Sequence, residues 1–496
     1  MLSPDRLWQW DGARWVPAAK GVAIDPPWMR LRVRTPAGRC ALVAVLGFGL
    51  LADQALRSPG LGLGAAIAIA AAGLLLVVVA PVARRPPRLL AAAAVLFGSW
   101  LSLRASPWLA WPDLASGVLL LATAASLAAR GSLLDLGLAE VGARIVQGLF
   151  QLLFGVPYVA APLAAARGRL GLLAPVARGL LIALPIAVVL AALLATADPI
   201  FASFFQLNLD LGRLALDAFY VALAAFALAG LLRLAASQPL DRVDAPRWRL
   251  GLVEGLTVLA VLDTVFAGFA VAQAIGYSSQ GYSEYARSGF FQLLWAAGLT
   301  LVVLLLFSRI TTFTSRRGHL GFVVLAEIAI ALTLVVVAVA HQRLSLYEAA
   351  YGFTMLRLYS HLFALLVGAV FLLLAAELAG IGRGRRWFAG AASLTALALL
   401  LALNVANPES LVVRLNLDRA AATSKLDVGY LVSELSADAV PPLLDGRGRL
   451  GPGLQAEVTR AVCAASPTEI PGGAAWNSSA DQAANARRAA CPSPHK

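Results

Sequence analysis

Residues 61–88 read LGLGAAIAIAAAGLLLVVVAPVARRPPR, an uncharged apolar run that ends in arginines. The run is long enough to cross the hydrocarbon core of a bilayer, which takes about twenty helical residues. Arg84, Arg85 and Arg88 follow it at once, whereas the next connection holds only Arg104. Because Lys and Arg gather in cytoplasmic loops, this stretch predicts a membrane helix whose C-terminal end lies in the cytoplasm.

The composition of the whole chain also indicates a membrane protein. Of 496 residues, 60% are hydrophobic and 14% are charged, against roughly a quarter charged in soluble proteins. The formal net charge is +13, but the basic residues are spread over short connections between apolar segments. We therefore expect membrane lipids as partners and no nucleic acid.

We predict an all-α fold, a polytopic transmembrane helical bundle of about eleven spans. The N-terminus is expected inside the cell and the C-terminus outside, because this orientation places every Arg-rich connection in the cytoplasm. The expected location is a bacterial plasma membrane. The expected spans are residues 40–57, 61–82, 88–104, 112–129, 177–197, 213–234, 251–276, 288–308, 320–341, 357–380 and 386–406.

The chain is expected to divide into four parts. These are a cytoplasmic head (1–38), the transmembrane domain (39–406), an extracytoplasmic helical segment (407–445) and a flexible extracytoplasmic tail (446–496). Within the transmembrane domain, residues 131–176 mix apolar side chains with Asp135, Glu140 and Arg144. We expect this segment to lie in the membrane interface, since a crossing at 146–163 would place all later Arg-rich connections outside.

The head carries a hairpin signal. Asp11-Gly12 joins two short alternating runs, which is typical of a two-residue turn. That turn would place Trp8 opposite Trp15, a stabilising aromatic pair. An interfacial aromatic anchor is the favoured interpretation, and binding of an unidentified protein partner is the other.

The cysteines give one candidate crosslink. Cys463 and Cys491 both lie in the expected external tail, where disulfides persist. Pairing and free thiols both remain open at this point, because the spacing says nothing of geometry. No Cys/His spacing resembles a zinc site, and we expect neither a metal site nor a cofactor.

Acidic residues inside the spans are functional candidates, because burying charge in a membrane is costly. Asp263 and Glu327 lie nearest the middle of their spans, whereas Asp217, Glu254 and Glu377 lie near span ends. One interpretation is a proton- or cation-coupled pathway. The other is hydrogen bonding to a neighbouring helix.

Two polar connections on the expected outer side form the second group of candidates. Arginine is scarce on this side, so we expect carboxylate partners for Arg287 and Arg357, with Glu284, Glu348 and Asp198 as candidates. A continuous helix over 345–361 would place Tyr347, Tyr351, Thr354 and His361 near one face. We favour a network that ties helix ends together over a pocket for an anionic or sugar-like ligand. The tentative binding residues are Asp198, Tyr285, Arg287, Tyr347, Glu348, Tyr351, Arg357 and His361.

The same stretches carry a family resemblance. The motifs are Ala197–Phe201, Tyr285–Phe290, Leu346–Gly352, Asn416–Arg419, Leu426–Leu431 and Ser436–Pro441. In this order they resemble bacterial polytopic membrane proteins grouped as domain of unknown function 4173, related to the group numbered 4153. The resemblance covers roughly residues 40–445. It implies a polytopic helical fold and supplies no catalytic residues.

Three function classes follow. The favoured one is a non-enzymatic envelope sensor, scaffold or regulatory protein. The alternative is a secondary transporter using Asp263 and Glu327, although the sequence shows no internal repeat of the kind many transporters have. A transferase with a lipid-linked donor is least favoured, because the first outer connection is short and the sequence has no His-Glu-x-x-His, P-loop or Gly-x-Ser-x-Gly motif.

Overall fold

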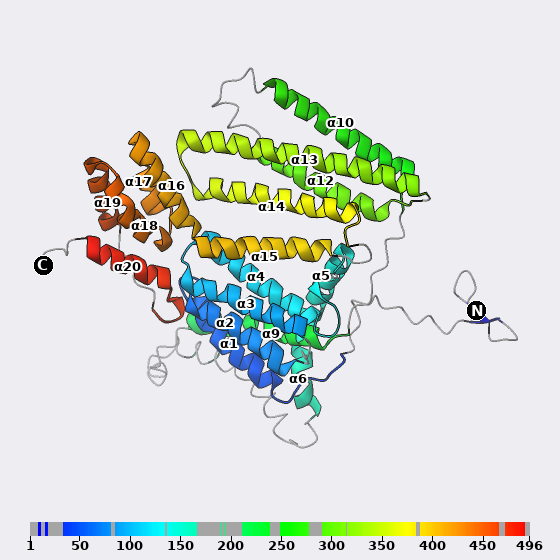
Figure 1. Ribbon diagram of the computed structural model, residues 1–496. Coiled ribbons are helices and arrows are strands. Elements are labelled where there is room, and N and C mark those ends of the chain that lie inside the picture. Colours follow the sequence, from blue (N-terminus) through cyan, green and yellow to red (C-terminus); the bar gives the residue numbers. More distant parts are fainter. Residues whose placement is uncertain are drawn as a thin grey trace.

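The described part of the chain folds into helices, apart from one short hairpin near the N-terminus (Figure 1). The computed structural model describes residues 8–10, 15–17, 33–80, 85–133, 136–165, 190, 194, 211–238, 249–276, 290–313, 315–382, 387–465 and 472–491. Within these ranges the helices form two groups and a separate C-terminal domain (Figure 1).

The N-terminal hairpin is present, but in a register different from the expected one. Strand β1 (Trp8–Trp10) pairs with β2 (Trp15–Pro17) in antiparallel fashion. Trp10 is opposite Trp15, and Trp8 is opposite Pro17. The predicted pairing of Trp8 with Trp15 was therefore wrong. Four residues separate the strands, a common hairpin length, and this register still sets two tryptophans opposite each other.

The first helix group comprises α1 (Ala41–Arg57), α2 (Leu63–Val79), α3 (Arg85–Leu103), α4 (Pro107–Ser126) and α9 (Leu211–Ala236). Leu76, Leu101 and Leu228 are almost fully buried in its core. Small residues allow the helices to approach closely. A Cβ atom on Gly98, for example, would lie 2.9 Å from the Ile69 side chain, so this position requires glycine.

Helices α5 (Leu138–Leu153) and α6 (Gly155–Ala165) pack against α9 and complete the first group. They meet at an angle of 52°. Figure 1 shows α5 running at a steep angle to α15. The bent pair is compatible with a broken span or a re-entrant segment, so the interfacial placement of 131–176 stays a prediction.

The second helix group comprises α10 (Leu252–Gly276), α12 (Phe290–Ile310), α13 (Arg316–Tyr351) and α14 (Met355–Leu378). Its core contains Leu259, Leu304, Phe322 and Phe371. Helix α15 (Phe388–Ala406) lies between α14 and α4 (Figure 1) and contacts both. It therefore joins the second group to the first.

The C-terminal domain, residues 408–490, gathers at one end of the bundle (Figure 1). Its helices are α16 (Pro408–Thr423), α17 (Val428–Ser433), η4 (Ala437–Ala439), α18 (Val440–Gly446), η5 (Arg447–Arg449), α19 (Pro452–Ala464), η6 (Gly473–Ala475) and α20 (Ser478–Ala490). They share a core that includes Val412, Leu431 and Leu443.

The prediction of a flexible tail after residue 446 was wrong for most of that segment, which forms helices. Helices α19 and α20 join the core of the C-terminal domain through Val458, Val462 and Ala483. Cys463 and Cys491 form a disulfide that links the ends of these two helices. The tail has few large apolar residues, but small alanines allow its helices to pack closely, and the crosslink holds them together.

The described residues support a multi-pass membrane protein. Eight of their helices are long and apolar enough to cross a membrane, namely α3, α4, α9, α10, α12, α13, α14 and α15, and the α5–α6 pair raises the number to nine if it is one span. Helices α1 and α2 have 17 residues each. The expected span 177–197 lies almost wholly outside the described residues. The count of eleven and the orientation are therefore not confirmed.

Replacing both Cys463 and Cys491 with serine should destabilise the C-terminal domain by about 3 kcal/mol, because the disulfide closes a long loop in the unfolded chain. Chemical unfolding followed by the fluorescence of Trp476, the one tryptophan in the sequence of this domain, measures the loss, with the tryptophans elsewhere in the chain replaced by phenylalanine. Cys40→Ser is the matched control, since Cys40 is exposed and unpaired. Equal stabilities of the double variant and the control would contradict the prediction.

Candidate functional site

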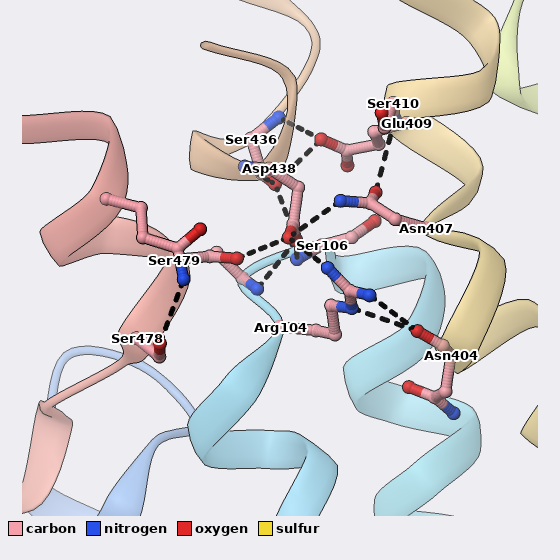
Figure 2. Close-up of polar contacts among 12 residues, drawn as sticks. Arg104, Ser106, Asn404, Asn407, Glu409, Ser410, Ser436, Asp438, Ser478 and Ser479 are labelled. Atoms are coloured by element: carbon pink, nitrogen blue, oxygen red, sulfur yellow. Dashed lines mark hydrogen bonds and ion pairs between the residues drawn. The ribbon is translucent and has the colours of Figure 1, made fainter. Parts of the chain in front are cut away.

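The carboxylate of Asp438, in η4, lies at the junction between the C-terminal domain and the bundle (Figure 2). Its side chain is completely buried. Oδ2 accepts hydrogen bonds from the backbone N–H groups of Ala105 and Ser106, at 2.7 and 2.8 Å. Oδ1 accepts a hydrogen bond from the Ser479 hydroxyl and lies 3.7 Å from Nη1 of Arg104. The C-terminal domain is thus bound to the turn between α3 and α4.

Local sequence places these groups. Ser106 is the N-cap residue of α4, and Pro107 follows it at the first helical position. The N–H groups at a helix start have no partner within the helix, so those of Ala105 and Ser106 are free to bind Asp438. Ser436 caps η4 by accepting a hydrogen bond from the N–H of Asp438. Ser106 and Pro107 therefore position the donors at the start of α4, and Ser436 positions Asp438 in η4.

Glu409 is a second buried acid at the same junction (Figure 2). It accepts hydrogen bonds from the backbone N–H and the hydroxyl of Ser436, at 2.8 and 2.7 Å. Asn407 precedes it in the left-handed conformation and caps α16 by accepting a hydrogen bond from the N–H of Ser410. Burial raises the pKa of Glu409, and the hydrogen bonds from Ser436 oppose that rise in part.

Asn404, near the end of α15, extends the network into the bundle. Its backbone oxygen accepts two hydrogen bonds from the guanidinium of Arg104, at 3.0 and 2.8 Å. Its side-chain amide donates to Oδ1 of Asp113 in α4, at 2.7 Å. Asn477, the N-cap residue of α20, donates to the backbone oxygens of Leu101 and Arg104. Four chain segments therefore meet at this junction.

The C-terminal domain is bound to the bundle at a second place, the turn between α13 and α14. Gly352 has a φ of 83°, and a Cβ atom there would lie 2.9 Å from Oδ1 of Asn416. Asn416, in α16, donates to the backbone oxygen of Phe353 and accepts from its N–H, at 2.8 and 3.1 Å. Tyr430 accepts a hydrogen bond from the N–H of Met355, at 2.8 Å. This turn is held by two residues of the C-terminal domain.

The same turn brings together four of the predicted binding residues. Residues 345–361 do not form one continuous helix, because the chain turns at Gly352 and α14 begins after Thr354. Tyr347 and Glu348 on α13 consequently face Arg357 and His361 on α14. Nε2 of His361 lies 2.9 Å from Oε2 of Glu348. The two helix ends are tied together here, as the favoured interpretation expects.

A second histidine extends this contact. Nδ1 of His361 lies 2.8 Å from Nδ1 of His341. One of these nitrogens must carry the hydrogen and the other must accept it, so the bond cannot form when both rings are fully protonated. His341, His361 and Glu348 form a continuous chain of hydrogen bonds between α13 and α14. Among the described residues, no group of three or more His, Cys, Asp or Glu is arranged to hold a metal ion.

Arg357 has partners other than the expected carboxylate. Its guanidinium carbon lies 4.5 Å from the centre of the Tyr347 ring, and Nη1 donates to the backbone oxygen of Gly352. Tyr347 also contacts the ring of Tyr351, which is 60% exposed. Glu348, one of the three carboxylates expected as partners for Arg287 and Arg357, binds His361 instead. The other two, Glu284 and Asp198, lie outside the described residues. The guanidinium of Arg357 therefore holds the end of α13 against the start of α14.

The other predicted residues fall elsewhere. Asp198, Glu284, Tyr285 and Arg287 lie outside the described residues. Asp263 and Glu327 lie on α10 and α13, which pack together. One carboxyl oxygen of each is buried, with no hydrogen-bond partner among the described residues. Both interpretations of these two acids, the ion pathway and the hydrogen bond to a neighbouring helix, stay predictions.

The family follows from a comparison with known protein families. The family model described as Domain of unknown function (DUF4153) matches residues 91–446, more than half of the chain. The chain belongs to this family. The related group expected from the sequence motifs is therefore shown, whereas membership of the group numbered 4173 is not. No curated protein and no solved structure matches the DUF4153 chain.

The central acids of this DUF4153 protein, Asp438 and Glu409, were not predicted from the sequence. Asp438 was visible only as part of the motif Ser436–Pro441, and Glu409 was not singled out at all. Two signals existed. Asn404 and Asp113 are polar residues within apolar runs, and Asn407-Pro408 is a typical helix start. Neither signal names the partner, because Asp438 and Ala105 are 333 residues apart.

Asp438→Asn should destabilise the junction of the DUF4153 protein by about 3 kcal/mol, because an amide NH₂ would replace one of the oxygens that accept from buried donors. Hydrogen exchange should become faster in residues 437–446 and at Ala105 and Ser106. Asp445→Asn, at an exposed position, is the control. Unchanged exchange in Asp438→Asn would show that the carboxylate does not hold the contact.

Glu409 should make stability depend on pH. Its pKa is raised in the folded protein, so its contribution is complete below the carboxyl's ordinary range and is lost as pH rises through the raised pKa. As the pH rises from the ordinary range of a carboxyl group through the raised pKa of Glu409, the melting temperature of the native protein should therefore fall relative to that of Glu409→Gln. Glu457→Gln, at an exposed position, should follow the native curve. Parallel curves for native protein and Glu409→Gln would contradict this.

Proposed function

We propose that this DUF4153 protein is a non-enzymatic sensor or scaffold of the bacterial envelope, whose C-terminal domain couples the two helix groups. The observation that carries the proposal is the double attachment of this domain. Asp438 and Asn477 bind the α3–α4 turn of the first group. Asn416 and Tyr430 bind the α13–α14 turn of the second. A partner that shifts the domain would change how the groups sit against each other.

The coupling is specific because its bonds are buried. A buried hydrogen-bonded carboxylate tolerates few alternative positions, since each lost donor leaves charge uncompensated. The attachment therefore favours discrete arrangements over continuous sliding. A ligand shifts such an equilibrium only by binding one arrangement better than the other. The C-terminal domain, which projects beyond the spans, is the natural place for that ligand or protein partner.

We place the C-terminal domain outside the cell and the chain in the bacterial plasma membrane. The distribution of arginine supports this orientation. The disulfide between Cys463 and Cys491 supports it independently, because structural disulfides are rare in the reducing cytosol. The head and its hairpin would then lie in the cytoplasm.

A secondary transporter is the alternative function, favoured by a specific observation. Asp263 and Glu327 each keep a buried carboxyl oxygen without a hydrogen-bond partner among the described residues. Buried intramembrane carboxyls often mark ion pathways. The hydrogen-bonded side chains of His341, His361 and Glu348 add groups able to hold a proton. A transferase stays the least favoured class, because the first outer connection is short and the sequence lacks the catalytic motifs named for such enzymes.

Complementation of a strain that lacks the gene separates the two functions. We expect the double variant Asp438→Asn/Asn416→Ala to fail in restoring growth under envelope stress, such as osmotic shock or detergent. Asp263→Asn/Glu327→Gln should restore it. Immunoblots of the membrane fraction must show equal amounts of both variants. If Asp438→Asn/Asn416→Ala restores growth and Asp263→Asn/Glu327→Gln does not, the proposal is contradicted and transport is supported.

The coupling itself can be measured by electron spin resonance. Spin labels at Leu103→Cys and Ser345→Cys, in a Cys40→Ser background, report the distance between the two helix groups at exposed positions. The distribution of distances between the labels should be narrow in the native protein and broad in Asp438→Asn/Asn416→Ala. Asp445→Asn provides the matched control. A narrow distribution in all three proteins would mean that the domain does not couple the groups.

A further inference from the structure

A cavity of about 320 Å³ lies between α4, α5 and α9, at the end of the bundle opposite the C-terminal domain. We propose that it binds one anionic phospholipid, with an acyl chain in the cavity and the phosphate on Arg144. The volume falls at the lower end of small-molecule sites, about 300 to 1,000 Å³. It lies outside the junction and the α13–α14 turn, so the proposal does not depend on the sensor function.

The lining of the cavity fits a hydrocarbon chain. It is formed mostly by apolar side chains, among them Leu119, Leu136, Ile145, Leu149, Leu152 and Leu231. Several of these also form an exposed apolar rim: Leu119 is 66% exposed, Leu149 62% and Ile145 58%. Apolar side chains on the surface of a membrane protein face lipid tails. The cavity is therefore open to the hydrocarbon phase, from which an acyl chain can enter and a soluble ligand cannot.

Arg144 gives the cavity a cationic side. It lines the same cavity, and its Nη1 donates to the backbone oxygen and the hydroxyl of Ser126, at 2.8 and 2.9 Å. These bonds fix the guanidinium at the end of α4. Its Nε is buried without a hydrogen-bond partner among the described residues. The nearest acid on the same helix, Glu140, attracts this guanidinium and also accepts a hydrogen bond from the N–H of Gly137, which caps α5.

An anionic headgroup is the occupant that matches this charge. A guanidinium presents parallel N–H donors to two phosphate oxygens, and a single apolar chain would leave those donors unused. Arg130, which follows the C-terminal end of α4, is exposed, and cationic residues near a membrane surface attract anionic lipid. A phosphatidylglycerol therefore fits both the apolar lining and the charge, whereas a zwitterionic lipid fits only the lining.

Gly148 offers a way to fill the cavity without disturbing the fold. It lines the cavity, and a Cβ atom there would meet only the Leu234 side chain, at the ordinary distance of 3.8 Å. Gly148→Leu should therefore occupy the space of the acyl chain. Gly142 lies on the same helix but not on the cavity, and a Cβ atom there meets nothing within 4 Å. Gly142→Leu is the matched control.

The test is native mass spectrometry of the full chain in detergent, titrated with phosphatidylglycerol or phosphatidylcholine. We expect one tightly retained phosphatidylglycerol per native chain, at least about tenfold weaker binding in Gly148→Leu, and native binding in Gly142→Leu. Arg144→Gln should bind both lipids equally. A shift in melting temperature on adding phosphatidylglycerol gives a second measure, and it also shows which variants are folded.

Three outcomes would overturn the proposal. Native protein that binds the two lipids equally would remove the role of Arg144. Folded Gly148→Leu that retains phosphatidylglycerol would place the lipid elsewhere on the surface. A native dimer that Gly148→Leu converts to a monomer would make a second copy of the chain the occupant. If Gly148→Leu does not fold, Arg144→Gln decides alone, because loss of the preference for phosphatidylglycerol is not expected from packing changes.

Discussion

The attachment of the C-terminal domain depends on the buried carboxylate of Asp438. Removing a carboxylate from water costs several kcal/mol unless donors replace the lost solvent. The donors come from the backbone of Ala105 and Ser106 and from the side chain of Ser479, with Arg104 nearby. Because these groups belong to the α3–α4 turn and to α20, satisfying one charge fixes the positions of three chain segments. This requirement orients the domain together with apolar contact, since Met355 of α14 is buried in the core of the domain.

The chain between the bundle and the domain has the contacts that the proposed coupling requires. Helix α15 contacts both helix groups and ends at Asn407, whose left-handed φ of 54° turns the chain into α16. Asn404, one turn earlier, is bonded to Arg104 and to Asp113. Movement of the C-terminal domain would therefore act on α15 through short, buried hydrogen bonds. Buried networks of this kind have few discrete arrangements, which is the property that a coupling element needs.

How far the sequence predicts this molecule depends on the range of the forces involved. Span length and the placement of arginine are local properties, and they located the long apolar helices well. A turn between α13 and α14 was expected, since the predicted spans end at 341 and begin again at 357, but its place at Gly352 could not be predicted. Asn416 and Tyr430 hold that turn from far along the chain. The folded tail was missed for a similar reason, since α19 and α20 have few large apolar residues and pack on a core supplied by α16 to α18.

Arginine has two different roles at the two ends of this bundle. At the end that carries the C-terminal domain, Arg57 pairs with Asp53 and Asp217 at 2.7 and 2.6 Å, and Arg104 and Arg357 are equally engaged. At the opposite end, Arg130, Arg316 and Arg317 are exposed. In the orientation that we propose, Arg57, Arg104 and Arg357 lie against the charge bias of membrane insertion, and each of these three has a structural role. An arginine on the wrong side of a predicted topology is thus better evidence for a structured site than the many that obey the bias.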